Sequence, residues 1–448
     1  MKQIGDIASG RLSEAELAAN FADVHPPLSP DEALIEASRC YFCFDAPCVQ
    51  ACPTGIDIPG FIRRIATGNL KGSAVKILEE NIFGGSCARV CPTEILCEGA
   101  CVRNTQEERP VKIGLLQRHA TDWLMQRNMQ PFERAQPTGK KIAVVGAGPA
   151  GLACAHRLAR YGHEVVVFES KPKPGGLNEY GVAAYKLTDE FARREVDFLL
   201  GIGGIRIEYG KTLGKDLSLG RLRQDYDAVF LGLGQAGVKA LGLDEAKLAG
   251  VEDAVAFIAR LRQTADKRTI AVGRRVVVIG GGNTAIDAAV QARKLGAEEV
   301  SLVYRRGPEQ MSATQWEQDF AKLNGVQIRH WAAPVRLLGE AGVVSGVEFA
   351  RTRLGPDGAL TLTEERFTLP ADMVLSAIGQ VFIMPATDEV PRIEGGRIVV
   401  DADRQTSLAR VFAGGDCIAG PDLTVQAVQD GKCAAEAIHR MLSGKRED

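Results

Sequence analysis

Eight of the eleven cysteines in this 448-residue chain lie between residues 40 and 101, in two groups of four. The four sulfurs of a group recur at short spacing, and a proline directly follows one cysteine of each group. Thiolates in fours are typical of iron–sulfur clusters, and a proline after a cysteine commonly turns the chain away from the cluster. The spacing therefore predicts an N-terminal region built around iron and sulfur. The two groups are Cys40, Cys43, Cys48 and Cys52, then Cys87, Cys91, Cys97 and Cys101.

Zinc and disulfides are the alternatives for these cysteines. Four cysteines also suit a tetrahedral structural zinc site, and cysteines form disulfides in oxidising compartments. However, residues 1–20 contain no apolar signal-peptide segment, and no apolar run approaches the roughly 18 residues that a membrane span needs. We therefore expect a cytoplasmic protein without membrane contact, in which metal ligation is favoured over disulfides.

Composition narrows the class of protein. The formal net charge is −2, so no global basic field attracts nucleic acid. A hydrophobic content of 45% and a charged content of 25% are ordinary for a globular chain. The length allows about two to four domains with ample core.

A glycine-rich loop follows a short apolar strand expected at residues 141–145. In such a loop Gly146 permits a tight turn, Gly148 lets the backbone approach a pyrophosphate, and Gly151 lets the next helix pack on the strand. The helix N-terminus then faces the phosphates, and Glu169, at the end of the second strand, can bind ribose hydroxyls. The pattern predicts a dinucleotide site formed by Gly146, Gly148, Pro149, Ala150, Gly151 and Glu169.

The same strand–loop–helix unit recurs after the expected strand 275–279, which indicates an internal duplication. Alanine replaces the last glycine, an accepted variant, and the second strand ends in Arg305 and Arg306 rather than an acid. Two guanidiniums favour the 2′-phosphate of NADP over the free hydroxyl of NAD. A solvated basic pair is the alternative, so NADP and NAD both stay open. The predicted site comprises Gly280, Gly282, Asn283, Thr284, Ala285, Arg305 and Arg306.

A third element, Gly415-Asp416, follows a strand and precedes a helix expected at 424–442. In flavoproteins with two dinucleotide sites this element closes on the flavin, so it assigns FAD to the first loop. Gly176 and Leu177 lie soon after Glu169 and are predicted to wrap the adenosine or the flavin. Hydride transfer between nicotinamide and flavin needs no protein acid or base. No catalytic residue is therefore predicted.

Together these patterns predict an α/β protein. A helical N-terminal iron–sulfur domain is followed by two Rossmann-like dinucleotide-binding domains, the second inserted in the first. The predicted boundaries are 1–135 for the helical domain with two clusters, 136–238 and 372–448 for the FAD domain, and 239–371 for the NAD(P) domain. Helices are expected at 30–39, 59–68, 73–81 and 113–129, with the cysteines in the loops between them.

The cysteine motifs resemble the N-terminal region of dihydropyrimidine dehydrogenase. The separate flavin subunit of the bacterial NAD(P)-dependent enzyme is similar over essentially the whole chain, and the glutamate synthase small subunit shares the layout. One local difference is Gly181-Val-Ala-Ala, where the family often has Gly-Ile-Pro. The segments that carry the resemblance are Ala37-Ser-Arg-Cys40, Cys43-Phe-Asp-Ala-Pro-Cys48, Ala51-Cys52-Pro53, Cys87-Ala-Arg-Val-Cys91-Pro-Thr-Glu and Ile113-Gly-Leu-Leu-Gln117.

The resemblance implies a ligand set for each of two [4Fe–4S] clusters. It assigns one cluster to Cys40, Cys43, Cys48 and Cys101. It assigns the other to Cys52, Cys91, Cys97 and Gln117, with Cys87 as a bystander beside this cluster. Judged locally, a glutamine such as Gln117 on a helix is most often exposed to solvent.

The resemblance also implies a function. Electrons would pass from NAD(P)H through FAD and two [4Fe–4S] clusters to an FMN-containing catalytic subunit that reduces uracil or thymine. That subunit must be a second polypeptide, because this chain has no room for an FMN barrel of about 250 residues. Two alternatives stay open: a glutamate synthase small subunit with the same electron path, and a cluster-bearing scaffold or redox sensor without turnover.

Overall fold

The computed structural model describes residues 6–243 and 248–444. Residues 1–5, 244–247 and 445–448, which belong to the predicted domains, lie outside the described residues. Packing divides the chain into two compact units. Unit 1 comprises Met1–Val24, Tyr180–Thr188 and Gly237–Val381, and unit 2 comprises His25–Glu179, Asp189–Ala236 and Phe382–Asp448. Across the described residues, every helix is too short or too polar to cross a membrane.

The N-terminal part of unit 2 is helical, as predicted. Ser29 caps α2 through a capping box, because its side chain accepts a hydrogen bond from Glu32 N while its own N–H donates to the Glu32 carboxylate at 2.8 Å. Pro30 supplies the first turn. The helices are α2 (Pro30–Ser38), α3 (Pro47–Gln50), α4 (Ile58–Ala66), α5 (Leu70–Glu80), α6 (Gly84–Val90), α7 (Asn104–Glu107) and α8 (Ile113–Met125).

The core of this helical part lies where α4, α5, α6 and α8 pack together. Phe61, Ile77 and Leu116 are fully buried there, and partly buried cysteines pack against the same cluster. Apolar burial of this kind contributes roughly 2 kcal/mol per large side chain. The helices therefore form a rigid support for the cysteine loops.

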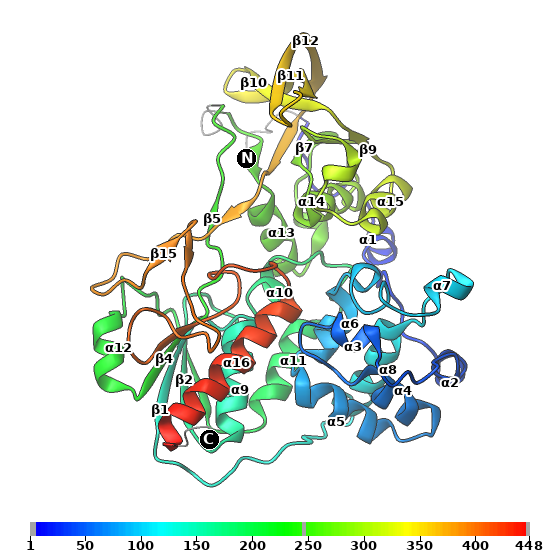
Figure 1. Ribbon diagram of the computed structural model, residues 1–448. Helices are drawn as coiled ribbons and strands as arrows, with labels where there is room; N and C mark the ends of the chain where they lie inside the picture. The colour runs from blue at the N-terminus through cyan, green and yellow to red at the C-terminus, as the bar shows by residue number, and fades with distance from the viewer. Residues whose placement is uncertain (1–5, 244–247, 445–448) are drawn as a thin grey trace. The chain divides into compact units, whose positions relative to one another are not determined.

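The rest of unit 2 is a parallel sheet with the strand order β17-β4-β1-β2-β3. Its central strand β1 pairs with β2 on one side and β4 on the other, with Val144 opposite Val167 and Phe230. Helix α9 (Pro149–Arg160) connects β1 to β2, and α16 (Thr424–Ser443) packs against α9 (Figure 1). The other elements are β1 (Lys141–Val145), β2 (Glu164–Glu169), α10 (Leu177–Tyr180), α11 (Phe191–Leu200), β3 (Ile205–Tyr209), α12 (Leu219–Asp225), β4 (Ala228–Leu231), β15 (Ile393–Glu394), β16 (Arg397–Ile398) and β17 (Val411–Ala413).

Unit 1 repeats this plan with the parallel strand order β6-β13-β7-β8-β9. Its strands lie in sequence between β4 and β17 of the first sheet, which confirms that the second Rossmann-like domain is inserted in the first. An antiparallel sheet of β10, β11 and β12, drawn in yellow in Figure 1, was not predicted. The elements are α1 (Glu14–Asn20), β5 (Gly237–Val238), β6 (Val251–Asp253), α13 (Ala254–Gln263), β7 (Arg275–Gly280), α14 (Asn283–Lys294), β8 (Glu299–Val303), α15 (Gln315–Leu323), β9 (Val326–Arg329), β10 (Ala332–Glu340), β11 (Val343–Leu354), β12 (Leu360–Pro370), β13 (Met373–Ala377) and β14 (Gln380–Val381).

Residues 180–188 belong to unit 1 although the sequence places them between strands of unit 2. A buried ion cluster holds them there. Lys186 Nζ lies 2.8 Å from Asp287 Oδ1 and 2.5 Å from Glu317 Oε1, and Tyr185 donates its hydroxyl hydrogen bond to Asp287 at 3.2 Å. Because removing one partner of a buried ion pair is costly, this cluster fixes the segment firmly.

A buried carboxyl on α11 makes the stability of unit 2 depend on pH. Glu195 accepts hydrogen bonds from Ser86 N, 3.0 Å away, and from the Ser86 hydroxyl. Burial raises the pKa of Glu195 from 4.5 to about 7. The folded state therefore binds more protons than the unfolded state between these two values, and stability falls as pH rises through this window.

We expect the melting temperature of Glu195→Gln to change less between pH 5 and 8 than that of the wild type, because the amide does not ionise. Thermal unfolding of both proteins across this range measures the difference. Equal slopes for the two proteins would show that Glu195 does not titrate in this window.

Candidate functional site

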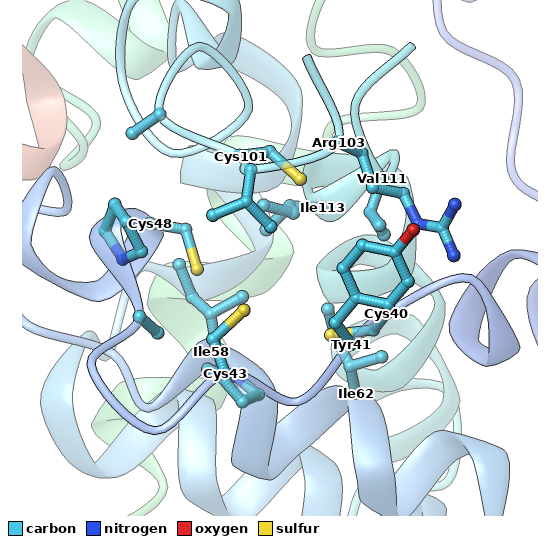
Figure 2. A pocket seen from close by; sticks show the side chains of 15 residues that line it. Cys40, Tyr41, Cys43, Cys48, Ile58, Ile62, Cys101, Arg103, Val111 and Ile113 are labelled. Atoms are coloured by element: carbon cyan, nitrogen blue, oxygen red, sulfur yellow. The ribbon is translucent and has the colours of Figure 1, made fainter. Parts of the chain in front are cut away.

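Four of the cysteines line one cavity in the helical part of unit 2. Figure 2 shows the side chains of Cys40, Cys43, Cys48 and Cys101 around this cavity. They come from the loop before α3, from α3 itself and from the loop before α7. The walls between the sulfurs are apolar and are formed by Ile58, Ile62, Val111 and Ile113, among others. This chemistry suits a cluster, because thiolate ligands and a dry wall are what iron–sulfur groups use.

Two of these thiols, those of Cys40 and Cys48, have a raised pKa and therefore hold their protons more tightly than an exposed cysteine does. Burial raises the pKa of Cys48 to about 12, and Cys40 and Cys101 lie close enough to add to the rise. Burial also raises the pKa of Cys40, with contributions from Cys43 and Cys101. The four sulfurs thus form one interacting group, and a bound metal must displace their protons.

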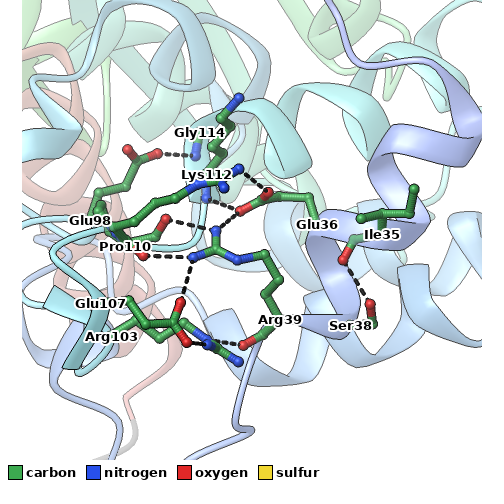
Figure 3. Close-up of polar contacts among 11 residues, drawn as sticks. Ile35, Glu36, Ser38, Arg39, Glu98, Arg103, Glu107, Pro110, Lys112 and Gly114 are labelled. Carbon is green, nitrogen blue, oxygen red and sulfur yellow. Dashed lines mark hydrogen bonds and ion pairs between the residues drawn. The ribbon is translucent and has the colours of Figure 1, made fainter.

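An arginine beside the first cysteine joins the two loops that carry this group (Figure 3). Arg39 donates to the Glu36 carboxylate at 2.6 Å, to Pro110 O at 3.1 Å and to Arg109 O at 2.7 Å. The Arg103 guanidinium donates in turn to Arg39 O. The network holds the Cys40 loop against the segment after Cys101. No local sequence pattern indicates this role of Arg39, although the residue directly precedes Cys40.

The other four cysteines form a second interacting group. A hydrogen bond with Cys87 and burial raise the pKa of Cys91, and the nearby Cys97 and Cys52 add to the rise. The pKa of Cys97 is raised first by burial, and Cys48 of the first group also contributes. The two groups of sulfurs are therefore neighbours in unit 2.

Two local expectations in this region were wrong. Cys48 and Cys87 lie in helices α3 and α6 rather than in loops. Gln117, expected to be exposed, retains only 7% of its surface, and its Nε2 donates to Gly84 O at the start of α6 at 2.6 Å. The contact between α6 and α8 places Gln117 beside the helix that carries Cys87. Burial of this residue depends on tertiary packing, which helix propensity does not encode.

The first glycine loop, the Gly176 segment and the C-terminal loop converge at the start of α9. Pro149, Ala150 and Gly151 are the first three residues of this helix. A Cβ at Gly176 would lie 2.8 Å from Gly148 Cα, and one at Gly415 would lie 3.0 Å from Ala150 Cβ. The Glu169 carboxylate accepts from Ala147 N at 2.7 Å and from Lys171 N at 2.7 Å. Leu177 begins α10 next to this loop.

The space at Gly148 tests whether a dinucleotide fits. Its backbone, at φ −81° and ψ −179°, is available to any residue, and an added Cβ would meet no protein atom closer than 3.8 Å. By contrast, position 146 requires glycine, because its φ is +103° and a Cβ there would lie 2.2 Å from Gly232 O. Neither the backbone conformation nor the packing of the protein requires glycine at position 148. The absence of a side chain there instead suits the close approach of a pyrophosphate.

Two polar side chains beside this loop also fit a bound flavin. Asn178, which we had not singled out, accepts from Thr424 Oγ1 at 2.9 Å, while its buried Nδ2 has no hydrogen-bond partner among the residues that the structure describes. Burial raises the pKa of Asp416 to about 6, and Asp422 adds to the rise. A buried donor and a half-buried carboxyl are suited to a ligand that carries carbonyls and hydroxyls.

The second glycine loop lies in unit 1 between β7 and α14. Gly280 has φ +155°, and a Cβ there would lie 2.3 Å from Ala377 O. Gly282 precedes α14, which begins with Asn283, Thr284 and Ala285. Asn283 Oδ1 is buried with no hydrogen-bond partner in 6–243 and 248–444, which fits a site for a polar ligand.

Arg305 and Arg306 follow β8, the strand after this helix. Arg305 is exposed and Arg306 is half-buried. Their backbone oxygens accept from Thr352 Oγ1 at 2.7 Å and from Trp331 N at 3.2 Å, respectively. The backbone of the pair is therefore fixed, while the Arg305 guanidinium stays accessible to an anion.

The sequence profile of the pyridine nucleotide-disulphide oxidoreductases matches residues 140–431, well over half of the chain. The chain belongs to the pyridine nucleotide-disulphide oxidoreductase family. A second profile, described as dihydropyrimidine dehydrogenase domain II with a 4Fe-4S cluster, matches residues 17–129. This oxidoreductase therefore uses FAD, NAD or NADP, and [4Fe–4S] iron–sulfur, as predicted.

Two curated relatives of this oxidoreductase match almost its whole length. The NAD-dependent dihydropyrimidine dehydrogenase subunit PreT of Salmonella typhimurium is 36% identical, over 94% of this chain and 98% of the relative. The glutamate synthase [NADPH] small chain of Escherichia coli is 35% identical, over 94% of each. These matches confirm the resemblance found in the sequence. They identify the chain as an FAD and iron–sulfur electron-transfer subunit.

Solved structures support the fold of this oxidoreductase. FprA from Mycobacterium tuberculosis, in complex with NADPH, is 22% identical with a TM-score of 0.57, covering 69% of this chain and 85% of that one. Thioredoxin reductase from T. acidophilum is 21% identical with a TM-score of 0.53, covering 67% of this chain and 99% of that one.

None of the eleven cysteines of the present chain, all of which lie in the described residues, forms a disulfide.

Proposed function

We propose that this chain is the electron-input subunit of a dihydropyrimidine dehydrogenase. When bound, FAD accepts a hydride from NAD(P)H and releases single electrons, which iron–sulfur clusters carry onward. The observation that supports this most directly is the cavity lined by Cys40, Cys43, Cys48 and Cys101, in the same compact unit as the flavin loops. A partner subunit with FMN then reduces uracil or thymine in the cytoplasm.

Each cluster has its own ligand set in this proposal. Cys40, Cys43, Cys48 and Cys101 hold the first cluster, and Cys52, Cys91, Cys97 and Gln117 hold the second. The first set is supported by its common cavity and the second by the mutual influence of its three cysteines. Cys87 stays beside the second cluster, hydrogen-bonded to Cys91. The cluster domain is 1–135.

The flavin and nicotinamide sites are proposed on the two Rossmann-like domains. FAD lies against Gly146, Gly148, Pro149, Ala150, Gly151, Glu169, Gly176, Leu177, Gly415 and Asp416, in the domain formed by 136–238 and 372–448. The nicotinamide dinucleotide lies against Gly280, Gly282, Asn283, Thr284, Ala285, Arg305 and Arg306, in the domain 239–371. The chain's residues bind and align the cofactors, and the open space at Gly148 supports this role.

Co-purification from the native host tests the partner. We expect a complex that contains FAD, FMN and iron and oxidises NAD(P)H only when uracil or thymine is added. A complex fully loaded with these groups but without pyrimidine-dependent activity would exclude the assignment. Absence of flavin reduction by either nucleotide would exclude every electron-transfer function.

A glutamate synthase small subunit is the second candidate. Its support is the E. coli glutamate synthase small chain, which is as similar to this chain as the dihydropyrimidine dehydrogenase subunit is. In that case the co-purified partner would form glutamate from glutamine and 2-oxoglutarate, with NAD(P)H as the reductant, and uracil would have no effect.

The arginine pair predicts a preference for NADPH. A double variant, Arg305→Ala with Arg306→Ala, is expected to raise KM for NADPH by about tenfold or more, because charge-assisted hydrogen bonds to a phosphate contribute about 1.5–3 kcal/mol. KM for NADH should change by less than about twofold, since NADH lacks the phosphate. Steady-state ferricyanide reduction measures both, and equal changes for the two nucleotides would contradict the assignment.

A further inference from the structure

Three consecutive residues of α16 contact three different parts of unit 2. They are Asp430, Gly431 and Lys432, all buried in the middle of the helix. On a helix, consecutive side chains point about 100° apart, so one turn can reach three neighbours at once. Each neighbour carries residues of a predicted cofactor site.

Asp430 contacts the C-terminal flavin loop. Its Oδ2 accepts from Gly415 N at 3.0 Å. Its Oδ1 accepts from Arg404 Nε at 3.0 Å and from Gln426 Nε2 at 3.0 Å. Gly415 lies in the left-handed region, with φ +73°. The hydrogen bond from its N–H to the Asp430 carboxylate stabilises this turn.

Gly431 contacts the helix that follows the first glycine loop. A Cβ at this position would lie 2.1 Å from Ala150 O and 3.0 Å from Cys154 N. The backbone of α16 therefore touches the first turn of α9, and only glycine permits this distance. The register between the two helices is set at this point.

Lys432 contacts the iron–sulfur region. Its Nζ donates to Thr54 O at 3.0 Å and to Glu80 Oε2 at 2.7 Å. Thr54 is buried two positions after Cys52, and its hydroxyl lies 3.3 Å from the Cys52 sulfur. The lysine thus ties the flavin helix to the loop that carries a predicted cluster ligand.

We propose that Lys432 is a positioning residue that fixes the Cys52 loop relative to the flavin loops and places a positive charge beside it. A stabilising role alone does not call for this ion pair, because two apolar side chains of similar volume often replace a buried pair at no cost. Here the Lys432 side chain is 10% exposed and is paired with the Glu80 side chain, which is 40% exposed. The inference rests on the proposed function, since it presupposes a flavin and a cluster that exchange electrons.

The test uses the full chain loaded with FAD and iron and compares Lys432→Met with the wild type. Stopped-flow absorbance follows flavin and cluster reduction by NAD(P)H, and EPR during a redox titration follows the clusters. We expect the flavin to be reduced at the wild-type rate. One cluster should change its EPR signal and have a lower midpoint potential. The rate at which the clusters are reduced should fall by about tenfold or more. The potential falls because loss of a positive charge disfavours the added electron.

Three further variants separate positioning from folding. Lys432→Arg keeps the charge and should restore most of the cluster reduction rate. Glu80→Gln removes the opposite charge, so the midpoint potential should shift upward, and this readout survives if Lys432→Met does not fold. Lys76→Met is the matched control, because Lys76 pairs with Asp57 at 3.4 Å on the exposed side of the same helical part. It should leave every readout unchanged.

The outcomes are distinguishable. Wild-type EPR, potential and cluster reduction in Lys432→Met, or shifts of the same sign in Lys432→Met and Glu80→Gln, would overturn the inference while leaving the proposed function intact. A wild-type protein without iron–sulfur or flavin would overturn the proposed function itself.

Discussion

Cys101→Ser is expected to remove one cluster and abolish electron output while leaving the flavin reducible. Iron content should fall by about half, because a serine hydroxyl is a far poorer metal ligand than a thiolate. Partner-dependent turnover should fall by about a hundredfold or more, which corresponds to about 2.7 kcal/mol. Metal analysis, EPR and NAD(P)H-dependent bleaching of the flavin measure the three effects.

Cys433→Ser is the matched control for this experiment. Cys433 lies on α16 outside both predicted ligand sets, and its sulfur accepts from Gln429 Nε2 at 3.2 Å. It should retain its full iron and activity. Unchanged iron in Cys101→Ser, or zinc in place of iron in the wild type, would contradict the proposed ligand set.

Gly148→Ala is expected to lose FAD without losing the fold. An added methyl group meets no protein atom closer than 3.8 Å, so the free energy of unfolding of the apoprotein should change by less than about 1 kcal/mol. The same methyl group occupies the space through which the pyrophosphate approaches. The dissociation constant of FAD should rise by about tenfold or more, or about 1.4 kcal/mol, measured by fluorescence titration of the apoprotein.

The variant Gly151→Ala is the control that separates loss of packing from loss of FAD binding. There a Cβ would lie 2.0 Å from Gly146 O and 3.1 Å from Val144 Cγ1. The variant should destabilise the apoprotein itself by about 1–3 kcal/mol. If both variants lose stability equally, Gly148 is required for packing rather than kept open for a ligand. If Gly148→Ala binds FAD normally, the dinucleotide is not held at this loop.

Local chemistry made much of this fold predictable. The strand 141–145 was predicted to the residue, because a buried apolar run and a glycine loop specify a βαβ unit. The capping box at Ser29 likewise encodes the start of α2.

What escaped prediction depends on partners that are distant in sequence. The strands of the β10–β12 sheet expose many polar residues, as β12 does with Glu364, Glu365 and Arg366, so they lack the apolar pattern by which buried strands are found. The burial of Gln117 depends on α6, and the contact of Lys432 depends on Thr54. No local pattern marks such residues.

The inserted architecture has a consequence for biosynthesis. Strand β17, at Val411–Ala413, is the last to join the sheet of unit 2, where it pairs with β4. During translation β4 therefore keeps an open edge while the whole insertion emerges from the ribosome. The insertion contributes every strand of its own parallel sheet, so it can fold first. The proposed flavin site includes Gly415 and Asp416, which follow the insertion in the sequence, so this proposed site is complete only after the whole insertion has been synthesised.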